Sequence, residues 1–283
     1  MRHYRRYMAL AMLLHLFSIS ANAETTLLLG VHPYKAVDKL QKAYQPLADL
    51  LASKLGRTVN LNIAKDYQTH IELVGNDQLD IAYLGPASYI EMVEQFGNKR
   101  ILARQVVNDE PTFKGKIITR SDSGIKQLAD LEGKRFAFGD PNSTMSHLVP
   151  RYMLIKNGIS KDKLQSFSFL GSHDNVAIGV LSGNFDAGAV KEAVYHKYKD
   201  KGLTSLASTE ALSEHLFVAS NRLPQVLVDN IKKILLDLKN HQAGRDIMNG
   251  IKKNMNAMAE ARDEDYDNLR NILSVLKQRK IIE

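Results

Sequence analysis

The stretch Phe138-Gly139-Asp140-Pro141-Asn142-Ser143-Thr144-Met145-Ser146-His147 shows how this chain is built. The residues around it predict a short strand, 135–138, and a helix, 144–156. Gly139 and the Asp140-Pro141 pair favour a turn between the two, and Asn142 or Ser143 is typical of the N-terminus of a helix. Pro150 predicts a kink, or the start of the regular helix, at that point.

The same alternation of strand and helix extends to both sides of this stretch. Upstream, strands at 25–31, 59–64, 79–84 and 101–107 alternate with helices at 40–55, 67–74 and 87–96; downstream, strands at 167–170 and 185–190 flank a helix at 175–182. Such alternation predicts an α/β fold with helices on both faces of a sheet.

An extended segment at 113–120 separates two such runs and predicts two lobes. The last third of the chain has helical patterns at 224–238 and 263–280, with no strand pattern strong enough for a third domain, and is expected to pack on the first lobe. The expected division is therefore a first lobe of residues 24–118 and 218–283 and a second lobe of residues 119–217.

The first 23 residues have the pattern of a secretory signal peptide. Three arginines precede the apolar run Met8–Ile19, and Ala21-Asn22-Ala23 matches the small-x-small motif of signal peptidase. An uncleaved anchor is the alternative, but this run is shorter than the ~20 residues that span a bilayer. The chain has no cysteine, which excludes lipid attachment through an N-terminal Cys and any disulfide. We expect a free periplasmic protein that begins near Glu24.

The charge of the chain argues against a nucleic-acid partner. Removing the three arginines of the signal segment from the 38 basic residues leaves 35 against 31 acidic ones, so the net charge falls from +7 to +4. The basic residues are spread along the chain and are not interleaved with aromatic residues. A small anionic ligand is compatible with this charge.

Three segments at predicted strand ends or turns carry candidate binding residues. The first offers the hydroxyls of Ser143, Thr144 and Ser146, the imidazole of His147 and the unpaired amides of a helix N-terminus, which together favour an anion. The second contains His173 and Asp174, and the third contains Asp186. All three are expected at one edge of the sheet, where open α/β sheets bind ligands. The alternatives are ordinary helix caps and, for Asp186, a solvated turn carboxylate.

The sequence gives little support for catalysis. It has no H-x-x-x-H metal pair, no G-x-S-x-G motif and no P-loop. Ser143, His147, His173 and Asp174 could be combined into a triad, but coincidences are expected among the seven histidines that follow the signal segment. We therefore expect no catalytic residues, no metal and no cofactor.

Several motifs resemble those of the periplasmic substrate-binding proteins of phosphonate, phosphite and phosphate ABC transporters. The resemblance covers almost the whole chain after the signal segment. The motifs are Gly30-Val31-His32-Pro33-Tyr34, Tyr44-Gln45-Pro46-Leu47, Asp66-Tyr67, 79–86, 138–152, Gly171-Ser172-His173-Asp174 and 183–190.

This resemblance implies a bilobal type II periplasmic binding protein, a Venus-flytrap fold of two α/β lobes joined by extended hinge segments. It also implies that Ser143, Thr144 and the next two positions, Met145 and Ser146, hold the phosphonyl group. Tyr34 and Tyr83 of the other lobe would close on it. Asp174 and Asp186 would face the far end of the ligand, where such acids bind the amine of an aminoalkylphosphonate.

One departure from the family pattern affects the ligand. Family members commonly have Ser-Thr-Ser-Gly, whereas this chain has Ser143-Thr144-Met145-Ser146. Met145 replaces a hydroxyl with a bulky thioether and is expected to reshape the pocket.

The resemblance further implies a monomer that delivers its ligand to the membrane permease of an ABC transporter. Two alternatives remain open at this stage: a periplasmic sensor that reports an oxyanion to a membrane receptor, and a hydrolase of phosphate esters.

Overall fold

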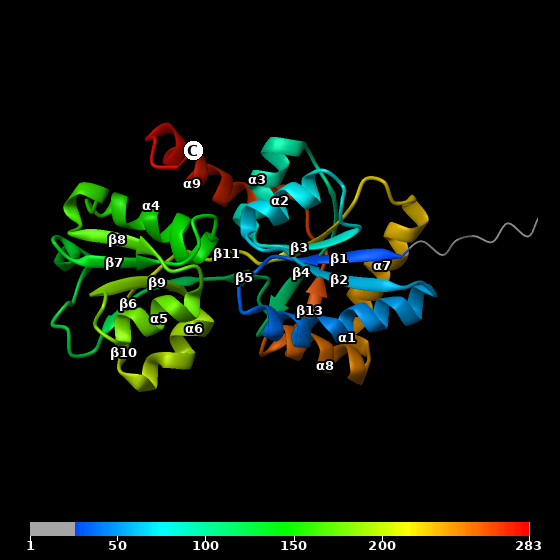
Figure 1. The fold of residues 1–283 in the computed structure, drawn as a ribbon, viewed down its shortest axis with the longest axis horizontal. Coiled ribbons are helices and arrows are strands. Elements are labelled where there is room, and N and C mark those ends of the chain that lie inside the picture. Colours follow the sequence, from blue (N-terminus) through cyan, green and yellow to red (C-terminus); the bar gives the residue numbers. More distant parts are fainter. Residues whose placement is uncertain (1–25, 283) are drawn as a thin grey trace, which may run out of the picture.

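Two β-sheets organise residues 26–282, which are the residues that this computed structural model describes. The predicted signal peptide lies outside them. Figure 1 shows the sheets side by side, each with helices on both faces. The predicted α/β fold with two lobes is therefore confirmed. We call the two parts the large-sheet lobe and the small-sheet lobe.

The large sheet has six strands. Their order is β13 (Met255–Ala259), β4 (Arg100–Val107), β12 (Leu216–Ala219), β3 (Ile81–Leu84), β1 (Leu27–Val31) and β2 (Val59–Ile63). Strand β1 pairs in parallel with both β2 and β3, whereas β12 is antiparallel to β3 and β4. The helices of this lobe are α1 (Val37–Leu55), α2 (Tyr67–Gly75), α3 (Pro86–Phe96), α7 (Gln225–Asp237), α8 (Gln242–Ile251) and α9 (Asp267–Gln278).

The small sheet has five strands. Their order is β10 (Leu203–Ser208), β6 (Gly115–Arg120), β9 (Ala187–Lys191), β7 (Arg135–Phe138) and β8 (Ser166–Phe169). Strands β7, β8 and β9 are parallel, so the loops after them reach the same edge. The helices of this lobe are α4 (Val149–Lys156), α5 (His173–Leu181) and α6 (Glu192–Tyr198).

Helix α1 illustrates how apolar spacing builds the large-sheet lobe. Leu40, Tyr44, Leu47 and Leu51 recur at helical spacing and are all fully buried in one cluster with β1 and β2. Burying each such side chain contributes about 1.5–3 kcal/mol. The helix ends at Gly56, whose φ of 63° is the left-handed conformation that glycine adopts without strain.

The chain passes between the lobes at two short strands, β5 (Thr112–Phe113) and β11 (Leu212–Ser213), which pair with each other. Strands β6 and β12, which follow them, begin a few residues before the predicted lobe boundaries. The division of the chain at those boundaries stays a prediction.

After β9 the chain adds four strands that the sequence pattern did not predict, β10, β11, β12 and β13. Two of them, β12 and β13, join the large sheet. Strand β12 has only four residues, all buried, and β13 shows no regular alternation of buried and exposed positions. Strand β12 is therefore too short, and β13 too irregular, to be predicted from the sequence pattern. Their pairing with β3 and β4 determines their structure instead. The predicted helices at 224–238 and 263–280 correspond to α7 and α9.

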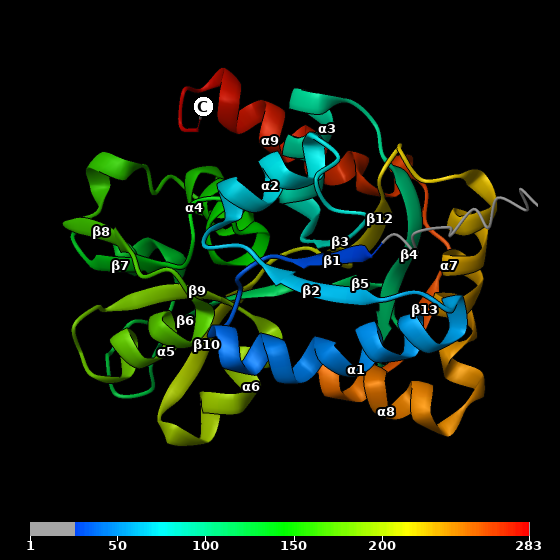
Figure 2. The same cartoon turned by 45° about the vertical axis from the view of Figure 1, so that its right-hand side comes forward.

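Helix α9 lies beside α3 of the large-sheet lobe and also contacts α4 of the small-sheet lobe, as Figure 2 illustrates. Among the described residues, no helix is long and apolar enough to cross a membrane.

Candidate functional site

A small cavity lies where the two lobes meet, beside the hinge strands. It offers about 20 Å³ to the centre of a water-sized sphere, which is slightly more than one water molecule requires. The size of this cavity therefore suits a compact ligand better than an extended one. The lining residues are His32, Tyr34, Tyr67, Gly85 and Ser88 of the large-sheet lobe, Phe113 and His215 of the hinge, and Asn142, Ser143, Thr144, Met145, His173 and Lys191 of the small-sheet lobe.

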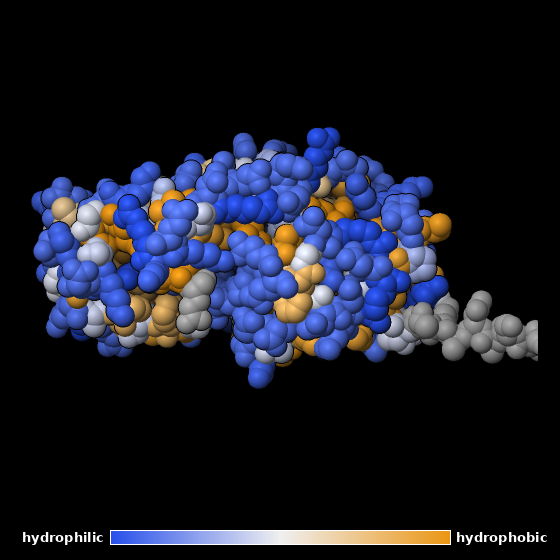
Figure 3. Space-filling model, turned by 90° about the horizontal axis from the view of Figure 1, so that it is seen from above, coloured by the Kyte–Doolittle hydropathy of each residue, from blue (hydrophilic) through white to orange (hydrophobic). Residues whose placement is uncertain are grey.

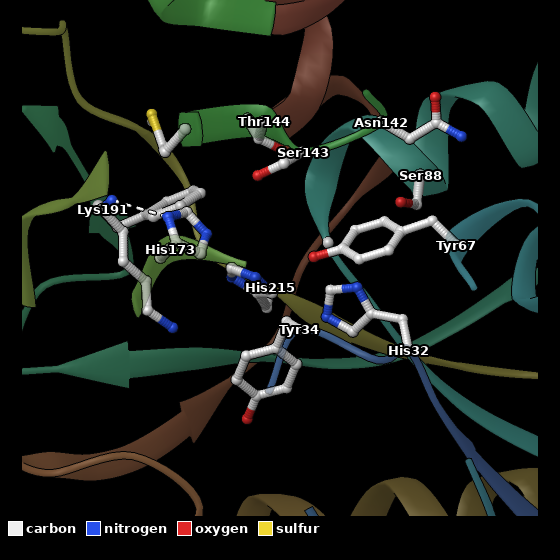
Figure 4. Close-up of a pocket in the computed structure, with 13 residues that line it drawn as sticks. His32, Tyr34, Tyr67, Ser88, Asn142, Ser143, Thr144, His173, Lys191 and His215 are labelled. Carbon is white, nitrogen blue, oxygen red and sulfur yellow. Dashed lines mark hydrogen bonds between the residues drawn. The ribbon is translucent and has the colours of Figure 1, made fainter. Parts of the chain in front are cut away.

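The loop after β7 brings Ser143 to this cavity. The Ser143 hydroxyl accepts a hydrogen bond from the amide of Ser146 at 3.2 Å, so Ser143 caps the following helix. Its own proton remains available to a ligand, and Figure 4 shows this hydroxyl directed toward the cavity. The first turn, Thr144–Leu148, is a π-helix, and regular α-helix begins at Val149, next to Pro150. The predicted change of helix geometry at Pro150 is thus confirmed.

The four residues after Ser143 have different roles. Thr144 joins the lobes, because its hydroxyl accepts a hydrogen bond from the amide of Ala87 at 3.0 Å. Met145 lines the cavity and lies 3.5 Å from the hydroxyl of Thr209, measured at its sulfur. Ser146 is fully buried and donates to the carbonyl of Ala189 at 2.5 Å. Ser146 therefore fixes the loop and does not face the cavity.

His147 also lies outside the small cavity. Its Nδ1 is 2.6 Å from the carbonyl of Pro141, and its ring packs edge-on against Phe138 and Phe169. Burial lowers the pKa of His147 to about 4. His147 is thus a neutral side chain that supports the turn before Ser143.

The two tyrosines predicted from the family pattern lie at different depths. Tyr34 lines the cavity, and its hydroxyl is 3.1 Å from that of Tyr44; burial raises the pKa of Tyr34 to about 12. Tyr83 lies behind the lining residues, where its hydroxyl donates to Gln105 at 3.3 Å and its ring stacks on His215. Figure 4 shows that the hydroxyl of Tyr67, which was not among the predicted binding residues, points into the cavity.

Two buried polar side chains of the lining have no partner. Both ring nitrogens of His32 and the hydroxyl of Ser88 are buried and form no hydrogen bond with any described residue. An unpaired buried polar group costs about 1–3 kcal/mol, so such groups usually mark a place where another molecule binds. His32 belongs to the motif Gly30–Tyr34, but the sequence does not show that these two side chains lack partners, because that arises only from the packing of residues far apart in the chain.

Lys191 provides the positive charge of the lining. It ends β9, and its ammonium group lies 4.7 Å from the centre of the Tyr34 ring. Among the described residues, no carboxylate forms an ion pair with it. Burial, together with Lys252 and Lys35, lowers the pKa of Lys191 to about 7. The strand-end rule that selected Ser143 would also have found Lys191, because β9 is parallel to β7.

Asp186 is not at the predicted edge of the sheet. Its amide donates to the carbonyl of Arg135 at 2.9 Å, and its carboxylate accepts from the Arg135 guanidinium at 2.8 Å. Because Asp186 precedes β9 instead of following it, it lies beside the start of β7, at the edge opposite to Ser143. The expectation that it shares an edge with Ser143 is wrong.

Asp174 lies at the expected edge, in the first turn of α5, but its carboxylate is occupied. It accepts hydrogen bonds from Lys197 and from the hydroxyl of Tyr198, which is 2.9 Å away. These bonds lower the pKa of Asp174 although burial raises it. Asp174 is absent from the cavity lining, so the expectation of two carboxylates in one pocket is wrong. His173, its neighbour, does line the cavity.

The electrostatic character of the cavity suits an anion. Among the described lining residues there is no Asp or Glu. Burial lowers the pKa of the three lining histidines, His32, His173 and His215, so they are neutral donors or acceptors at neutral pH. The hydroxyls of Ser143, Ser88 and Tyr67 and the ammonium of Lys191 then supply hydrogen-bond donors.

A larger groove opens on the side of the molecule seen in Figure 3, between α3, α9 and the loop before α4. It offers about 680 Å³ to the centre of a water-sized sphere and includes Glu91, Glu94 and His147. Its two carboxylates make it a poorer place for an anion than the small cavity. In the part of the chain that the structure describes, no group of three or more His, Asp or Glu could hold a metal ion.

Comparison with known proteins identifies the family. The profile of the family described as "ABC transporter, phosphonate, periplasmic substrate-binding protein" matches residues 29–266. The chain belongs to this family.

Two relatives cover most of the chain. The phosphate-import protein PhnD of Mycolicibacterium smegmatis is 26% identical over 280 residues, which are 90% of this chain and 87% of the relative. The probable ABC transporter phosphite-binding protein PhnD1 of Prochlorococcus marinus is 27% identical over 267 residues, 86% of this chain and 87% of the relative.

Solved structures agree on the fold. The structure of PhnD1 from Prochlorococcus marinus in complex with methylphosphonate has a TM-score of 0.82, with 23% identity over 89% of this chain and 98% of that one. The binding-protein component of a phosphonate ABC transporter from Pseudomonas aeruginosa has a TM-score of 0.80, with 20% identity over 90% of this chain and 87% of that one. The predicted type II periplasmic binding fold is thereby confirmed.

Proposed function

We propose that this protein binds a compact phosphorus oxyanion between its two lobes and delivers it to the permease of an ABC transporter. The observation that carries the proposal is the combination of unpaired buried groups on His32 and Ser88 with the cationic Lys191 and no carboxylate in one cavity. Hydrogen bonds to a charged ligand contribute roughly 1.5–3 kcal/mol each. Three or four of them outweigh the cost of association and support micromolar binding.

The size and charge of the cavity favour phosphate, phosphite or methylphosphonate over an aminoalkylphosphonate. An ammonium group needs a carboxylate or several carbonyl oxygens, whereas the cavity instead presents Lys191. The names of the two relatives, a phosphate-import protein and a probable phosphite-binding protein, agree with a small ligand. The sequence-based expectation of an amine-bearing ligand is therefore not retained.

The proposal includes export, a monomeric state and no catalysis. Mass spectrometry of the periplasmic protein should give an N-terminus at or near Glu24, and the full-length chain in the membrane fraction would contradict cleavage. Light scattering should give the mass of one chain. No turnover of a generic phosphate ester is expected, and turnover would instead favour the hydrolase.

Calorimetry with phosphate, phosphite, methylphosphonate and 2-aminoethylphosphonate tests the ligand class. We expect at least one of the first three to bind with micromolar or better affinity and the aminoalkylphosphonate to bind more weakly. Ser88→Ala should weaken binding by about 1–3 kcal/mol, the value of one buried hydrogen bond to the anion.

The matched control is Ser274→Ala, since Ser274 is exposed on α9 and should leave the affinity unchanged. Equal affinity of the wild type and Ser88→Ala would remove Ser88 from the site. Failure of all phosphorus oxyanions to bind would overturn the proposed function.

A further inference from the structure

We propose that the Glu214–His215 pair of the hinge makes the cavity select an oxyanion that carries a proton on one oxygen, and reject fully deprotonated sulfate. This inference rests on the proposed function, because it concerns the same cavity. It follows from the hydrogen bonds that fix the protons of two lining histidines.

Glu214 determines which nitrogen of His215 carries the proton. Nδ1 of His215 lies 2.9 Å from Oε2 of Glu214. The Glu214 side chain is fully buried and also forms an ion pair with Lys252. Burial alone raises the pKa of Glu214, but Lys252 and His215 lower it to about 2. A carboxylate accepts hydrogen bonds and cannot donate them. Nδ1 of His215 must therefore hold the proton, which leaves a lone pair on Nε2.

His173 is held in the opposite tautomer. Its Nδ1 accepts a hydrogen bond from the backbone amide of Lys191 at 3.0 Å, which Figure 4 marks with a dashed line. An accepting Nδ1 carries no proton, so Nε2 of a neutral His173 carries it. The small-sheet lobe thus offers a donor at His173, and the hinge offers an acceptor at His215.

Both rings are neutral because of what surrounds them. Burial lowers the pKa of His215, and Lys252 after α8 and Lys191 at the end of β9 lower it further, against the opposite effect of Glu214. His32 of the β1 end lies 5.7 Å from His215, centroid to centroid, and is itself neutral. The stacked Tyr83 ring adds no charge, because burial raises its pKa well above the usual value.

The acceptor nitrogen of His215 faces the cavity wall at Gly85. A Cβ on Gly85 would lie 3.7 Å from Nε2, and both residues line the cavity. Among the described residues, Nε2 has no hydrogen-bond partner. The carboxyl of Glu214 itself is out of reach, since only 1% of its side chain is exposed. Nε2 of His215 is therefore the acceptor that a ligand meets.

The lone pair on Nε2 of His215 favours an anion that has an O–H group to donate over one that has none. Hydrogen phosphate and sulfate have the same charge and nearly the same shape, but only hydrogen phosphate has an O–H group to donate to Nε2. Sulfate would place a charged oxygen against the lone pair and leave this nitrogen, which the ligand covers, unpaired. The expected selectivity is roughly 10- to 100-fold, the cost of one unpaired buried group next to a charge. For a phosphonate, the same contact selects the singly protonated form.

Two variants test this assignment by calorimetry with sodium phosphate and sodium sulfate. Glu214→Gln removes the negative charge that holds the ring proton on Nδ1 of His215, so the proton is no longer kept away from Nε2. We expect weaker phosphate binding and stronger sulfate binding, so that the ratio of the two affinities falls at least about ten-fold. His215→Gln keeps the Glu214–Lys252 ion pair and removes the fixed lone pair, and it should also reduce the ratio.

The matched control is His241→Gln, because His241 is exposed and pairs with Asp237 away from the cavity; its ratio should equal that of the wild type. The ¹⁵N chemical shifts of the histidine rings provide a readout of a different kind: His215 should show the Nδ1–H form and His173 the Nε2–H form. If Glu214→Gln does not fold, the affinity ratio of His215→Gln and the ¹⁵N chemical shifts of the wild-type histidines still test the assignment.

The outcomes separate this inference from the proposed function. Wild-type protein that binds phosphate and sulfate equally, or a ratio unchanged in His215→Gln, overturns the selectivity while leaving the phosphorus oxyanion site intact. Wild-type protein that binds no phosphorus oxyanion overturns the proposed function. A histidine spectrum with the proton of His215 on Nε2 would also contradict the assignment.

Discussion

Lys191 is the residue whose charge responds most directly to a bound anion. Its pKa of about 7 results first from burial and then from Lys252 and Lys35. A bound anion stabilises the ammonium form and raises this pKa. Above about pH 7 binding should therefore take up a proton, and the affinity should fall as the pH rises. Below that pH the lysine is already charged, and this contribution should be constant.

Lys191→Gln tests this charge. At about pH 8.5, where phosphate is almost entirely hydrogen phosphate, the wild type should take up a fraction of a proton on binding and the variant should take up none. Calorimetry in two buffers of different ionisation enthalpy measures the uptake. The variant should also lose about 1.5–3 kcal/mol of binding free energy. Lys39→Gln, in the first turn of α1 and exposed, is the control; proton uptake that persists in Lys191→Gln would contradict the role of Lys191.

Individual residues of the site could be predicted from the sequence only where a local pattern determines their position. Ser143 was found because a cap follows a strand and a turn, which are local features. His32 follows strand β1 and could have been selected by a similar rule. That its ring nitrogens and the Ser88 hydroxyl are unpaired could not be predicted, since this depends on contacts between residues far apart in the chain. Asp186 was misplaced because the sheet-edge rule was applied to a turn that precedes a strand; its position before β9 puts it at the other edge.

The start of α3 and the π-helical turn before α4 contact each other across the cleft. The amide of Ala87 is one of the first in α3 and has no acceptor within its own helix. The hydroxyl of Thr144 accepts its hydrogen bond at 3.0 Å. In an open molecule, water could bind the same amide. This contact therefore favours the closed arrangement of the lobes without stabilising either lobe alone.

Thr144→Val keeps the shape of the side chain and removes the acceptor. The amide of Ala87 would then be buried and unpaired on closing, so ligand affinity should fall by about 1–3 kcal/mol, and the melting temperature of the ligand-free protein should change little. Calorimetry and thermal unfolding measure the two effects. Thr58→Val, at an exposed position before β2, is the control. An equal loss of stability with and without ligand would show that Thr144 acts within its own lobe.

The elements also show why the topology was only partly predictable. Helices such as α1 were recovered because one face is regularly apolar over many residues. Strands β12 and β13 were missed, although both join the large sheet, because burial on both faces or irregular pairing removes the alternation on which such predictions depend. Their positions are set by β3 and β4, more than 100 residues earlier in the chain.

For the whole molecule, two hinge strands joining two separately packed sheets imply that the lobes can move apart about β5 and β11. The ligand would then enter the open cleft and complete its hydrogen bonds only on closing, because the lining comes from both lobes and the hinge. Closure in turn provides a shape that a permease could distinguish from the open form.

A disulfide across the cleft tests this coupling between closure and ligand exchange. The chain has no cysteine, so Ala87→Cys with Thr144→Cys introduces one pair, at positions joined by a 3.0 Å hydrogen bond from the Ala87 amide to the Thr144 hydroxyl. Oxidised without ligand, the variant should bind phosphate far more slowly than after reduction; oxidised with ligand, it should retain the phosphate through dialysis. The reduced variant is the internal control, because it has lost the same Thr144 hydroxyl. Equal rates of exchange in the oxidised and reduced forms would mean that phosphate reaches the cavity without separation of the lobes.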